Sequence, residues 1–137
     1  MTQVVVDTSA LLAILEGEPD AERFEQALFR SRGDAQITAA NLLEAMLVIE
    51  SRNPDNGAQD LRSLIDIFAI TVEPVTHELA EVAFHAWKRF GKGRHPAALK
   101  YGDCFAYALA RHLGAPLLFK GKDFLQTDVA DALSEIF

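Results

Sequence analysis

Residues 4–15 read VVVDTSALLAIL, three β-branched residues followed by an aspartate and then by a run with helical character. The valines indicate a short buried strand over residues 3–6 that ends at Asp7. Residues 10–15 continue as a helix, so the carboxylate stands where a strand gives way to a helix. In parallel α/β sheets, ligands bind beyond the carboxyl ends of the strands, and we therefore expect Asp7 at such an edge.

The rest of the chain repeats this alternation of strand and helix. Strands and helices that alternate in this way imply a parallel, doubly wound α/β sheet. At 137 residues the chain fits one domain, 1–137. The expected strands are residues 35–38, 70–72 and 116–119, and the expected helices are residues 20–30, 39–52, 58–68, a helix capped by Thr76, and residues 101–113.

Several of these elements carry more detailed expectations. The helix over residues 39–52, AANLLEAMLVIESR, is mostly apolar and is expected to be largely buried. The helix after Thr76 is expected to pack inward through an apolar face that includes Trp87. Gly114 is well placed to end the following helix. The tail from Val129 onward is weakly patterned.

The composition is that of an ordinary globular protein, 50% hydrophobic and 24% charged. No apolar run approaches the roughly 20 residues that span a bilayer, and the N-terminus lacks the basic start of a signal peptide, so we expect a soluble cytoplasmic protein without a membrane segment. Cys104 is the single cysteine, which excludes an intrachain disulfide and favours a buried structural thiol. The net charge of −7 argues against a broad basic face that coats nucleic acid and favours a cationic partner, an ion or a peptide.

Three acidic residues interrupt apolar stretches. Asp7 interrupts VVVDTSALLAIL, Glu44 interrupts NLLEAMLVI, and Asp103 interrupts YGDCFAYALA. Burying a carboxylate is costly unless it has a hydrogen-bonding, cationic or metal partner. Several acids that meet at one point and share a divalent cation would explain all three, and hard oxygen ligands suit Mg²⁺ or Mn²⁺.

Each acid also has a plainer interpretation. Asp7 would serve as an N-cap, Glu44 would lie on a solvent-facing stripe, and Asp103 would be a first-turn acid favoured by the helix dipole. Asp123 and Asp128 follow a predicted strand, and Asp123 in the KGKDF turn would be a turn residue.

Hydroxyl groups flank these acids in the sequence. Thr8 and Ser9 follow the first aspartate, and Thr127 precedes the last. Such hydroxyls can hydrogen-bond a ligated carboxylate or a metal-bound water. Local capping is an equally good interpretation of all three.

Three blocks in this order resemble the PIN-domain family, and within it the VapC-type toxins of bacterial toxin–antitoxin pairs. The blocks are VVVDTSALLAIL, ANLLEAMLVIESR and YGDCFAYALARHLGAPLLFKGKDFLQTDV. Together with the helices between them they cover nearly the whole chain, and residues 101–129 are the most specific part. The resemblance implies a PIN-like three-layer α/β/α sandwich with a central parallel sheet, usually dimeric, with an acidic pocket for Mg²⁺ or Mn²⁺.

The resemblance also assigns residues to the pocket. The first three family acids fall on Asp7, Glu44 and Asp103. Many PIN domains have an aspartate two residues before the position of Asp123, where this chain has Gly121. We choose Asp123 as the fourth acid, with Asp128 as the alternative. These four acids are the candidate catalytic residues and metal ligands.

The implied activity is that of a metal-dependent endoribonuclease that hydrolyses RNA phosphodiester bonds and is neutralised by a cognate VapB-like antitoxin. A bound divalent cation lowers the pKa of water, so no side-chain nucleophile is required. A basic loop, KRFGKGRHPAALK, leads into Asp103. We expect its Lys92, Arg94 and Lys100 to contact RNA phosphates, with a plain solvated loop as the alternative. A homodimer is expected from the resemblance.

Other functions fit the sequence less well. A haloacid-dehalogenase-type phosphatase would require a second aspartate two residues after Asp7, where Ser9 stands. The paired acids and phosphoacceptor aspartate of a response-regulator receiver domain are not evident. The remaining alternative is a catalytically silent PIN-like module that binds a partner protein, and retention of three acids within apolar stretches argues against it.

Overall fold

The computed structural model describes residues 3–136 and contains a four-stranded sheet with strand order β3-β2-β1-β4. Every neighbouring pair is parallel. In the register, Val5 of the interior strand β1 lies opposite Gln36 on one side and Leu117 on the other. The strands are β1 (Val4–Val6), β2 (Ala35–Thr38), β3 (Thr71–Glu73) and β4 (Leu117–Leu118).

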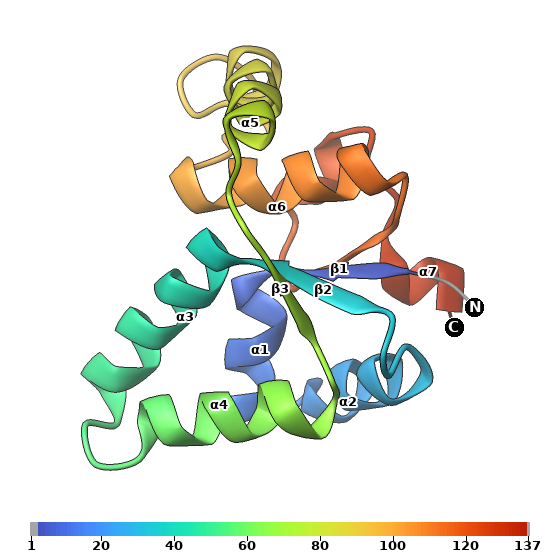
Figure 1. Cartoon of the computed structure of the whole chain (residues 1–137). Helices are drawn as coiled ribbons and strands as arrows, with labels where there is room; N and C mark the ends of the chain where they lie inside the picture. Colours follow the sequence, from blue (N-terminus) through green and yellow to red (C-terminus); the bar gives the residue numbers. More distant parts are fainter. Residues whose placement is uncertain (1–2, 137) are drawn as a thin grey trace.

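Helices cover both faces of this sheet. The predicted α/β/α sandwich with a central parallel sheet is therefore confirmed. In Figure 1, α5 and α6 lie above the sheet, whereas α1, α2 and α4 lie below it, with α3 running down beside them. The helices are α1 (Thr8–Leu15), α2 (Ala21–Arg30), α3 (Ala39–Arg52), α4 (Gly57–Ile67), α5 (His77–Phe90), α6 (Tyr101–Leu113), the 3₁₀ turn η1 (Asp123–Gln126) and α7 (Ala132–Ile136).

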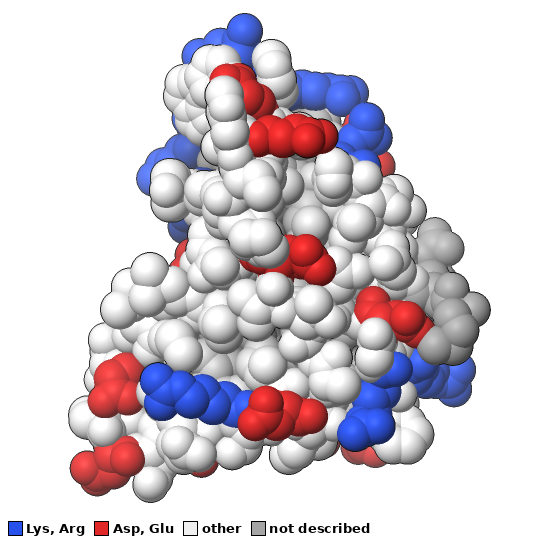
Figure 2. All heavy atoms as spheres, in the orientation of Figure 1, with Lys and Arg blue, Asp and Glu red and all other residues white. Residues whose placement is uncertain are grey.

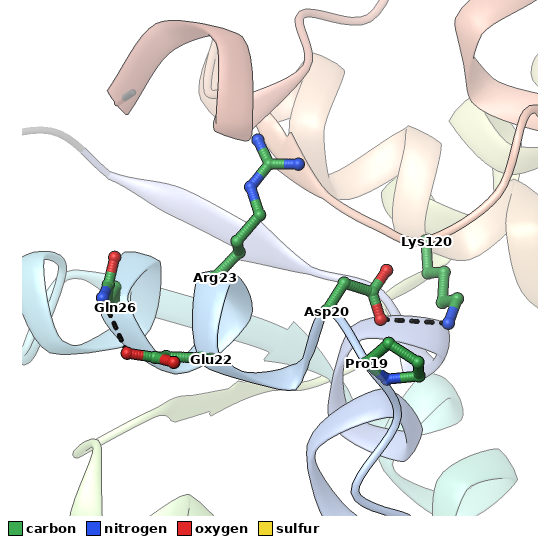
Figure 3. Close-up of a pocket in the computed structure, with 6 residues that line it drawn as sticks. All are labelled: Pro19, Asp20, Glu22, Arg23, Gln26 and Lys120. Atoms are coloured by element: carbon green, nitrogen blue, oxygen red, sulfur yellow. Dashed lines mark hydrogen bonds and ion pairs between the residues drawn. The ribbon is translucent and has the colours of Figure 1, made fainter.

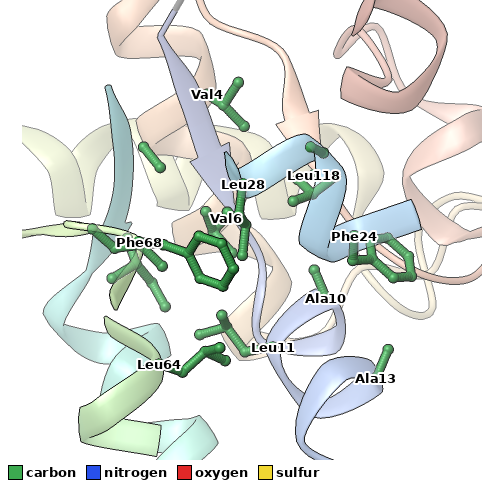
Figure 4. Packing of buried hydrophobic residues seen from close by; sticks show 14 of the residues in the cluster. Val4, Val6, Ala10, Leu11, Ala13, Phe24, Leu28, Leu64, Phe68 and Leu118 are labelled. Atoms are coloured by element: carbon green, nitrogen blue, oxygen red, sulfur yellow. The ribbon is translucent and has the colours of Figure 1, made fainter. Parts of the chain in front are cut away.

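Two hydrophobic clusters form, one on each face of the sheet. Val4 and Val6 point into the cluster under α1 to α4, whereas Val5 points into the cluster under α5 and α6. This division follows from the strand geometry, because successive side chains point to opposite faces. Figure 4 shows the first cluster, where Phe24 and Leu28 of α2 pack toward β1 as their helical spacing predicts.

Polar caps set the helix boundaries. The hydroxyls of Thr38 and Thr76 accept hydrogen bonds from backbone N–H groups in the first turns of α3 and α5. Gly114 ends α6 in the left-handed conformation with φ of 63°, which glycine adopts without strain. The predicted capping by Thr76 and Gly114 is therefore confirmed.

Two expectations require correction, and a segment for which no element was expected forms a helix. Helix α3 is buried along one face only, and Leu43 and Leu47 face solvent. Trp87 is 40% exposed rather than packed inward, because it lies at the outer edge of the contact between α5 and α6. The weakly patterned tail forms α7, which packs against α2 and β4.

Two further expectations have structural outcomes. Cys104 is buried as expected, and burial raises the pKa of its thiol to about 11. Among the described residues, none of the helices combines the length and the apolar character needed to cross a bilayer.

Candidate active site

The four candidate acids come from four different elements and meet beyond the carboxyl end of β1. Asp7 is the N-cap of α1, Glu44 lies in α3, Asp103 lies in the first turn of α6, and Asp123 begins η1. Asp7 interacts electrostatically with Asp103 and Glu44, and Asp103 interacts with Asp123 and Glu44. The structure therefore brings together the acids that the sequence singled out, while their catalytic roles stay a prediction.

Asp7 is buried, and it caps α1 with one of its two oxygens. The backbone N–H and the hydroxyl of Ser9 both donate to Oδ2, at 3.0 and 2.6 Å. Among the described residues no donor reaches Oδ1, which leaves that oxygen free for a ligand. Burial raises the pKa of Asp7 to about 7, the two Ser9 hydrogen bonds oppose this change, and the charges of Asp103 and Glu44 add to it. The N-cap interpretation is thus correct, but it accounts for the contacts of Oδ2 and not for Oδ1.

Lys120 fixes Ser9 from the opposite side. The Lys120 backbone N–H donates to the Ser9 hydroxyl at 2.9 Å, and its ammonium group binds Glu18 at 2.5 Å and Asp20 at 3.0 Å. Figure 3 shows the Lys120–Asp20 pair at one side of a hollow of about 450 Å³ that Arg23 also lines. The loop after β4 is thereby fastened to the α1–α2 connection, which holds Ser9 and Asp7 in place.

Glu44 is oriented by two neighbours and approached closely by a third. The Thr8 hydroxyl donates to Glu44 Oε1 at 2.7 Å, and the Asn41 amide lies 3.4 Å from the same oxygen. A Cβ atom added at Gly102 would lie 2.4 Å from Oε2 and 2.6 Å from Oε1 of Glu44. Only glycine therefore lets the first turn of α6 come this near to the Glu44 carboxylate.

Asn41 is the residue of this site that sequence reasoning missed. Its side chain is fully buried, donates to the Gly102 carbonyl at 2.9 Å and accepts from the Thr38 hydroxyl at 2.6 Å. It ties α3 to the start of α6, one turn before Glu44. The available signal was a buried amide within an apolar run, because such a group needs hydrogen-bond partners.

Asp103 lies within the turn that begins α6. Its Oδ2 accepts the Lys100 backbone N–H at 2.9 Å, so the first-turn interpretation is also correct. Burial raises the pKa of Asp103, the Lys100 hydrogen bond opposes this, and the charges of Asp123 and Glu44 raise it further. Lys100, one of the expected RNA-contacting residues, therefore stands beside the acids and not only in the preceding loop.

Asp123 is exposed beside Asp103, whereas Asp128 is engaged elsewhere. Asp128 accepts a hydrogen bond from the Tyr107 hydroxyl and pairs with Arg89 at 3.1 Å and Arg111 at 3.3 Å. Partial burial raises the pKa of Asp128, but the Tyr107 hydrogen bond and the two arginines together outweigh it and hold the pKa below its usual value. The geometry thus favours Asp123 over Asp128 as the fourth acid.

The hydroxyl candidates divide in the same way. Thr8 and Ser9 hydrogen-bond the acidic residues Glu44 and Asp7. The Thr127 hydroxyl donates instead to the Phe124 carbonyl at 2.7 Å, a local contact within its own turn. Local capping is therefore the correct interpretation of Thr127 alone.

The donor chemistry of the site fits a hard divalent cation. All four side chains offer carboxylate oxygens. A bound cation would offset the free-energy cost of burying these charges and their mutual repulsion, which are the two causes that raise the pKa of Asp7 and Asp103. In the part of the chain that the structure describes, no three acidic, histidine or cysteine side chains stand close enough to enclose an ion as they are placed. Binding therefore requires the carboxylates to turn toward the ion.

The basic loop after α5 is a closed structure with exposed cations. Its ends are joined by hydrogen bonds from the Lys92 N–H to the Leu99 carbonyl and from the Leu99 N–H to the Phe90 carbonyl, both 2.9 Å. Arg94 donates to the Lys88 carbonyl at 3.0 Å, and Lys92 is exposed. On the face shown in Figure 2, basic side chains gather around the end of the molecule formed by α5. Contact of this loop with RNA stays a prediction.

Comparison with known proteins gives a consistent picture. A family model described as "PIN domain" matches residues 4–130. The chain is 46% identical over 127 residues to Ribonuclease VapC30 of Mycobacterium tuberculosis, covering 93% of this chain and 96% of the relative. It is 47% identical over 127 residues to Ribonuclease VapC of Mycolicibacterium smegmatis, covering 93% and 98%.

Solved structures share the fold at low sequence identity. Mycobacterium tuberculosis VapC20, described as a sarcin-ricin loop cleaving toxin, matches with a TM-score of 0.77 at 18% identity and covers 94% of this chain and 98% of its own. A DNA-bound VapBC from Salmonella typhimurium matches with a TM-score of 0.71 at 13% identity, covering 96% of each chain.

Proposed function

Because the chain belongs to the PIN-domain family, we propose that it is a metal-dependent endoribonuclease that hydrolyses RNA phosphodiester bonds. Its relatives at 46% and 47% identity are named ribonucleases and align with nearly its whole length. In this proposal, Asp7, Glu44, Asp103 and Asp123 hold Mg²⁺ or Mn²⁺. When bound, such a cation lowers the pKa of a coordinated water and offsets charge on the phosphate.

Individual side chains have separate roles in this proposal. Asp7 would bind the cation through Oδ1, because the Ser9 N–H and hydroxyl occupy Oδ2. Glu44 is held by Thr8 through Oε1, and its Oε2 lies beside Gly102 with no hydrogen-bond donor among the described residues. Asp123, exposed at the rim, can orient the attacking water or accept its proton. Lys100, next to Asp103, can contact a phosphate of the bound RNA.

The observation that carries this proposal is the close packing of Gly102 against the Glu44 carboxylate. Gly102 inside α6 and the buried Asn41 in α3 each cost free energy of folding. Together they bring the turn that carries Asp103 close to Glu44. A catalytically silent module that only binds a protein has no need for carboxylates in mutual repulsion. The acidic arrangement therefore favours catalysis over that alternative.

The test is incubation of the purified protein with total cellular RNA, with and without Mg²⁺ or Mn²⁺. We expect discrete products that require metal and that disappear in the isosteric variant Asp7→Asn. The matched control is Asp60→Asn, which removes an exposed acid from α4. If neither metal supports cleavage and calorimetry detects no metal binding, the silent binding module becomes the correct function.

The proposal includes a role as the toxin of a toxin–antitoxin pair. The Salmonella protein that shares this fold is a VapBC assembly, and the acidic pocket suits a basic side chain of a VapB-like antitoxin. Expression of the chain alone should stop growth, and co-expression of the cognate antitoxin should restore it. An active purified nuclease that leaves growth unaffected would argue against the toxin role.

A further inference from the structure

Lys120 lies two residues beyond β4, and its ammonium group pairs with two carboxylates at once. It lies 2.5 Å from a Glu18 oxygen and 3.0 Å from an Asp20 oxygen, both in the connection between α1 and α2. The Glu18 hydrogen bond, and after it that of Asp20, raises the pKa of the ammonium group. A single surface ion pair contributes little to stability, whereas one cation shared by two carboxylates restricts the loop that carries it.

The segment that Lys120 binds is itself well fixed. The Glu18 N–H donates to the Ala13 carbonyl at 3.0 Å, and the Glu18 carbonyl accepts the Ala21 N–H at 2.9 Å. These bonds join Glu18 to the end of α1 and to the first turn of α2. The Lys120 side chain is therefore attached to two packed helices through a segment with its own hydrogen bonds.

The backbone of Lys120 reaches the acidic site through Ser9. At the end of the pairing between β1 and β4, the Asp7 N–H donates to the Leu118 carbonyl at 2.9 Å. Two residues further along both segments, the Lys120 N–H donates to the Ser9 hydroxyl at 2.9 Å. A hydroxyl has one hydrogen, and with the Lys120 N–H on the acceptor side of the Ser9 oxygen that hydrogen is directed to Asp7 Oδ2, 2.6 Å away. The position of the Lys120 backbone thus affects the orientation of the Asp7 carboxylate.

The neighbours of Lys120 are held independently of its charge. Phe119 and Phe124, on either side of it, are buried with their ring centroids 5.2 Å apart. Between them Gly121 has φ of 106°, and glycine leaves the backbone more freedom than any other residue. A substitution at Lys120 should therefore move its own peptide group while the rings keep the rest of the loop in place.

We propose that Lys120 is a positioning residue of the metal site. Its ammonium group, held by the α1–α2 connection, sets the place of its own N–H, and that N–H orients Asp7 through Ser9. The inference rests on the proposed nuclease function, in which Asp7 helps to hold Mg²⁺ or Mn²⁺. Its sign is opposite to that of plain electrostatics. Removing a nearby positive charge should tighten the binding of a divalent cation, whereas losing a positioning contact should weaken it.

Amide hydrogen exchange in EDTA, followed by NMR, tests the positioning without metal or RNA. The amide of residue 120 is held by Ser9, whereas the amide of Asp7 is held by the Leu118 carbonyl and serves as an internal reference. In Lys120→Met we expect the protection factor of the residue-120 amide to fall about tenfold, with that of Asp7 unchanged. Lys120→Arg should restore protection to within about twofold of wild type. Equal protection in Lys120→Met and wild type would overturn the proposal.

The contact can also be broken from its other side. The double variant Glu18→Gln/Asp20→Asn leaves Lys120 in place and replaces its two partners by neutral residues of equal size. We expect protection of the Lys120 amide to fall by a similar factor, about tenfold. Unchanged protection in this double variant would overturn the proposal even if Lys120→Met did not fold.

Calorimetric titration with Mn²⁺ then measures the effect on the site. We expect Lys120→Met to bind Mn²⁺ at least about fivefold more weakly, although the loop becomes more negative. The control Lys122→Met removes the same charge from an exposed position of this loop and should bind Mn²⁺ as tightly as wild type or more tightly. In a Ser9→Ala background Lys120→Met should cause no further loss, because the hydroxyl through which it acts is absent. Additive losses, or tighter binding by Lys120→Met, would overturn the proposal.

The two measurements separate this inference from the nuclease assignment. Metal-dependent cleavage by the wild type, together with unchanged exchange at residue 120 in Lys120→Met, would overturn the positioning role and leave the nuclease intact. Faster exchange at residue 120, in a protein that binds neither metal and cleaves no RNA, would support the link from Lys120 to Ser9 and overturn the nuclease.

Discussion

At the scale of single residues, two of the candidate acids use their two carboxylate oxygens differently. Asp7 uses one oxygen to cap α1, and the other accepts no hydrogen bond from the described residues. Glu44 binds Thr8 through one oxygen and leaves its partner beside Gly102. This division explains why the capping and catalytic interpretations of the sequence do not exclude each other.

Removing the charge of Asp7 should stabilise the metal-free protein at neutral pH. Burial raises its pKa from 3.8 to about 7, so between these values the unfolded chain releases the proton while the folded chain keeps it. Stability therefore falls as pH rises from about 4 to about 7, and the penalty is complete above that range. We expect Asp7→Asn to gain on the order of 4 kcal/mol at pH 8 in EDTA, measured by urea unfolding.

At pH 3.5 the same variant should nearly match the wild type, because Asp7 is then protonated in the folded state and mostly protonated in the unfolded state. Glu25→Gln, an exposed acid of α2, is the control and should change stability little at either pH. A wild-type protein whose unfolding free energy follows the same pH profile as Asp7→Asn would contradict the prediction.

Gly102→Ala should damage catalysis more than stability. The added Cβ would displace the Glu44 carboxylate, a flexible group that can rotate away. Alanine favours the helix over glycine by about 0.5–1 kcal/mol, which offsets part of the clash. We expect at least tenfold slower RNA cleavage with an unfolding free energy within about 1 kcal/mol of wild type, and His112→Ala on the same helix as an unaffected control. Unimpaired cleavage would show that catalysis does not depend on the present position of the Glu44 carboxylate.

At the scale of elements, helix boundaries were predictable wherever a local cap defined them. The expected ranges 39–52 and 101–113 match α3 and α6, because Thr38 and Gly114 act within one turn of the chain. The orientation of Trp87 was predicted wrongly, since helical periodicity gives a face but not which of its residues lies at the edge of a contact. The helix α7 depends on packing against α2 and β4, which sequence periodicity does not contain.

The connection between α3 and α6 should depend on the Asn41 side chain. Truncation by Asn41→Ala leaves the Thr38 hydroxyl and the Gly102 carbonyl without their partner inside the protein. We expect a loss of about 1–3 kcal/mol in unfolding free energy, measured by urea denaturation, together with slower cleavage. Asn53→Ala, at the exposed end of α3, should cause neither change. Equal stability of both variants would mean that the bonds of Asn41 contribute nothing net.

Asp123 and Asp128 should separate into a catalytic and a structural acid. Asp128→Ala releases Tyr107, Arg89 and Arg111 and is expected to cost about 1 kcal/mol without slowing cleavage more than about twofold. Because the pKa of Asp128 is lowered, this contribution exists above about pH 4 and is lost as pH falls.

Asp123→Asn should show the opposite pattern, with cleavage at least tenfold slower and stability unchanged or slightly higher as repulsion of Asp103 is relieved. Cleavage kinetics and urea unfolding on both variants make the comparison. The reverse result would restore Asp128 as the fourth acid.

At the scale of the whole molecule, part of the apolar surface of α3 is exposed to solvent. Leu43 and Leu47 lie one turn apart on the outer face of α3 and are both more than half exposed. Such a stripe matches the homodimer that the resemblance to VapC-type toxins implies. The exposure of each leucine depends on how α3 packs against the sheet, which the sequence does not contain.

Leu47→Glu should therefore shift the protein from dimer to monomer, because a carboxylate in an apolar contact loses its hydration without gaining a partner. Light scattering after size exclusion measures the mass directly. Phe29→Glu, on the exposed face of α2, is the control and should keep the wild-type mass. A monomeric wild type would remove the homodimer from the proposed assembly.

The order of the four acids along the chain has a consequence for synthesis in the cell. Asp7 is translated before Asp103 and Asp123, and β4 completes the pairing of β1 only when residues 117–118 are available. A growing polypeptide therefore cannot bring the four acids together before Asp123 has been added. Until that point, the topology of the sheet keeps the carboxylates of α1 and α6 from their final arrangement.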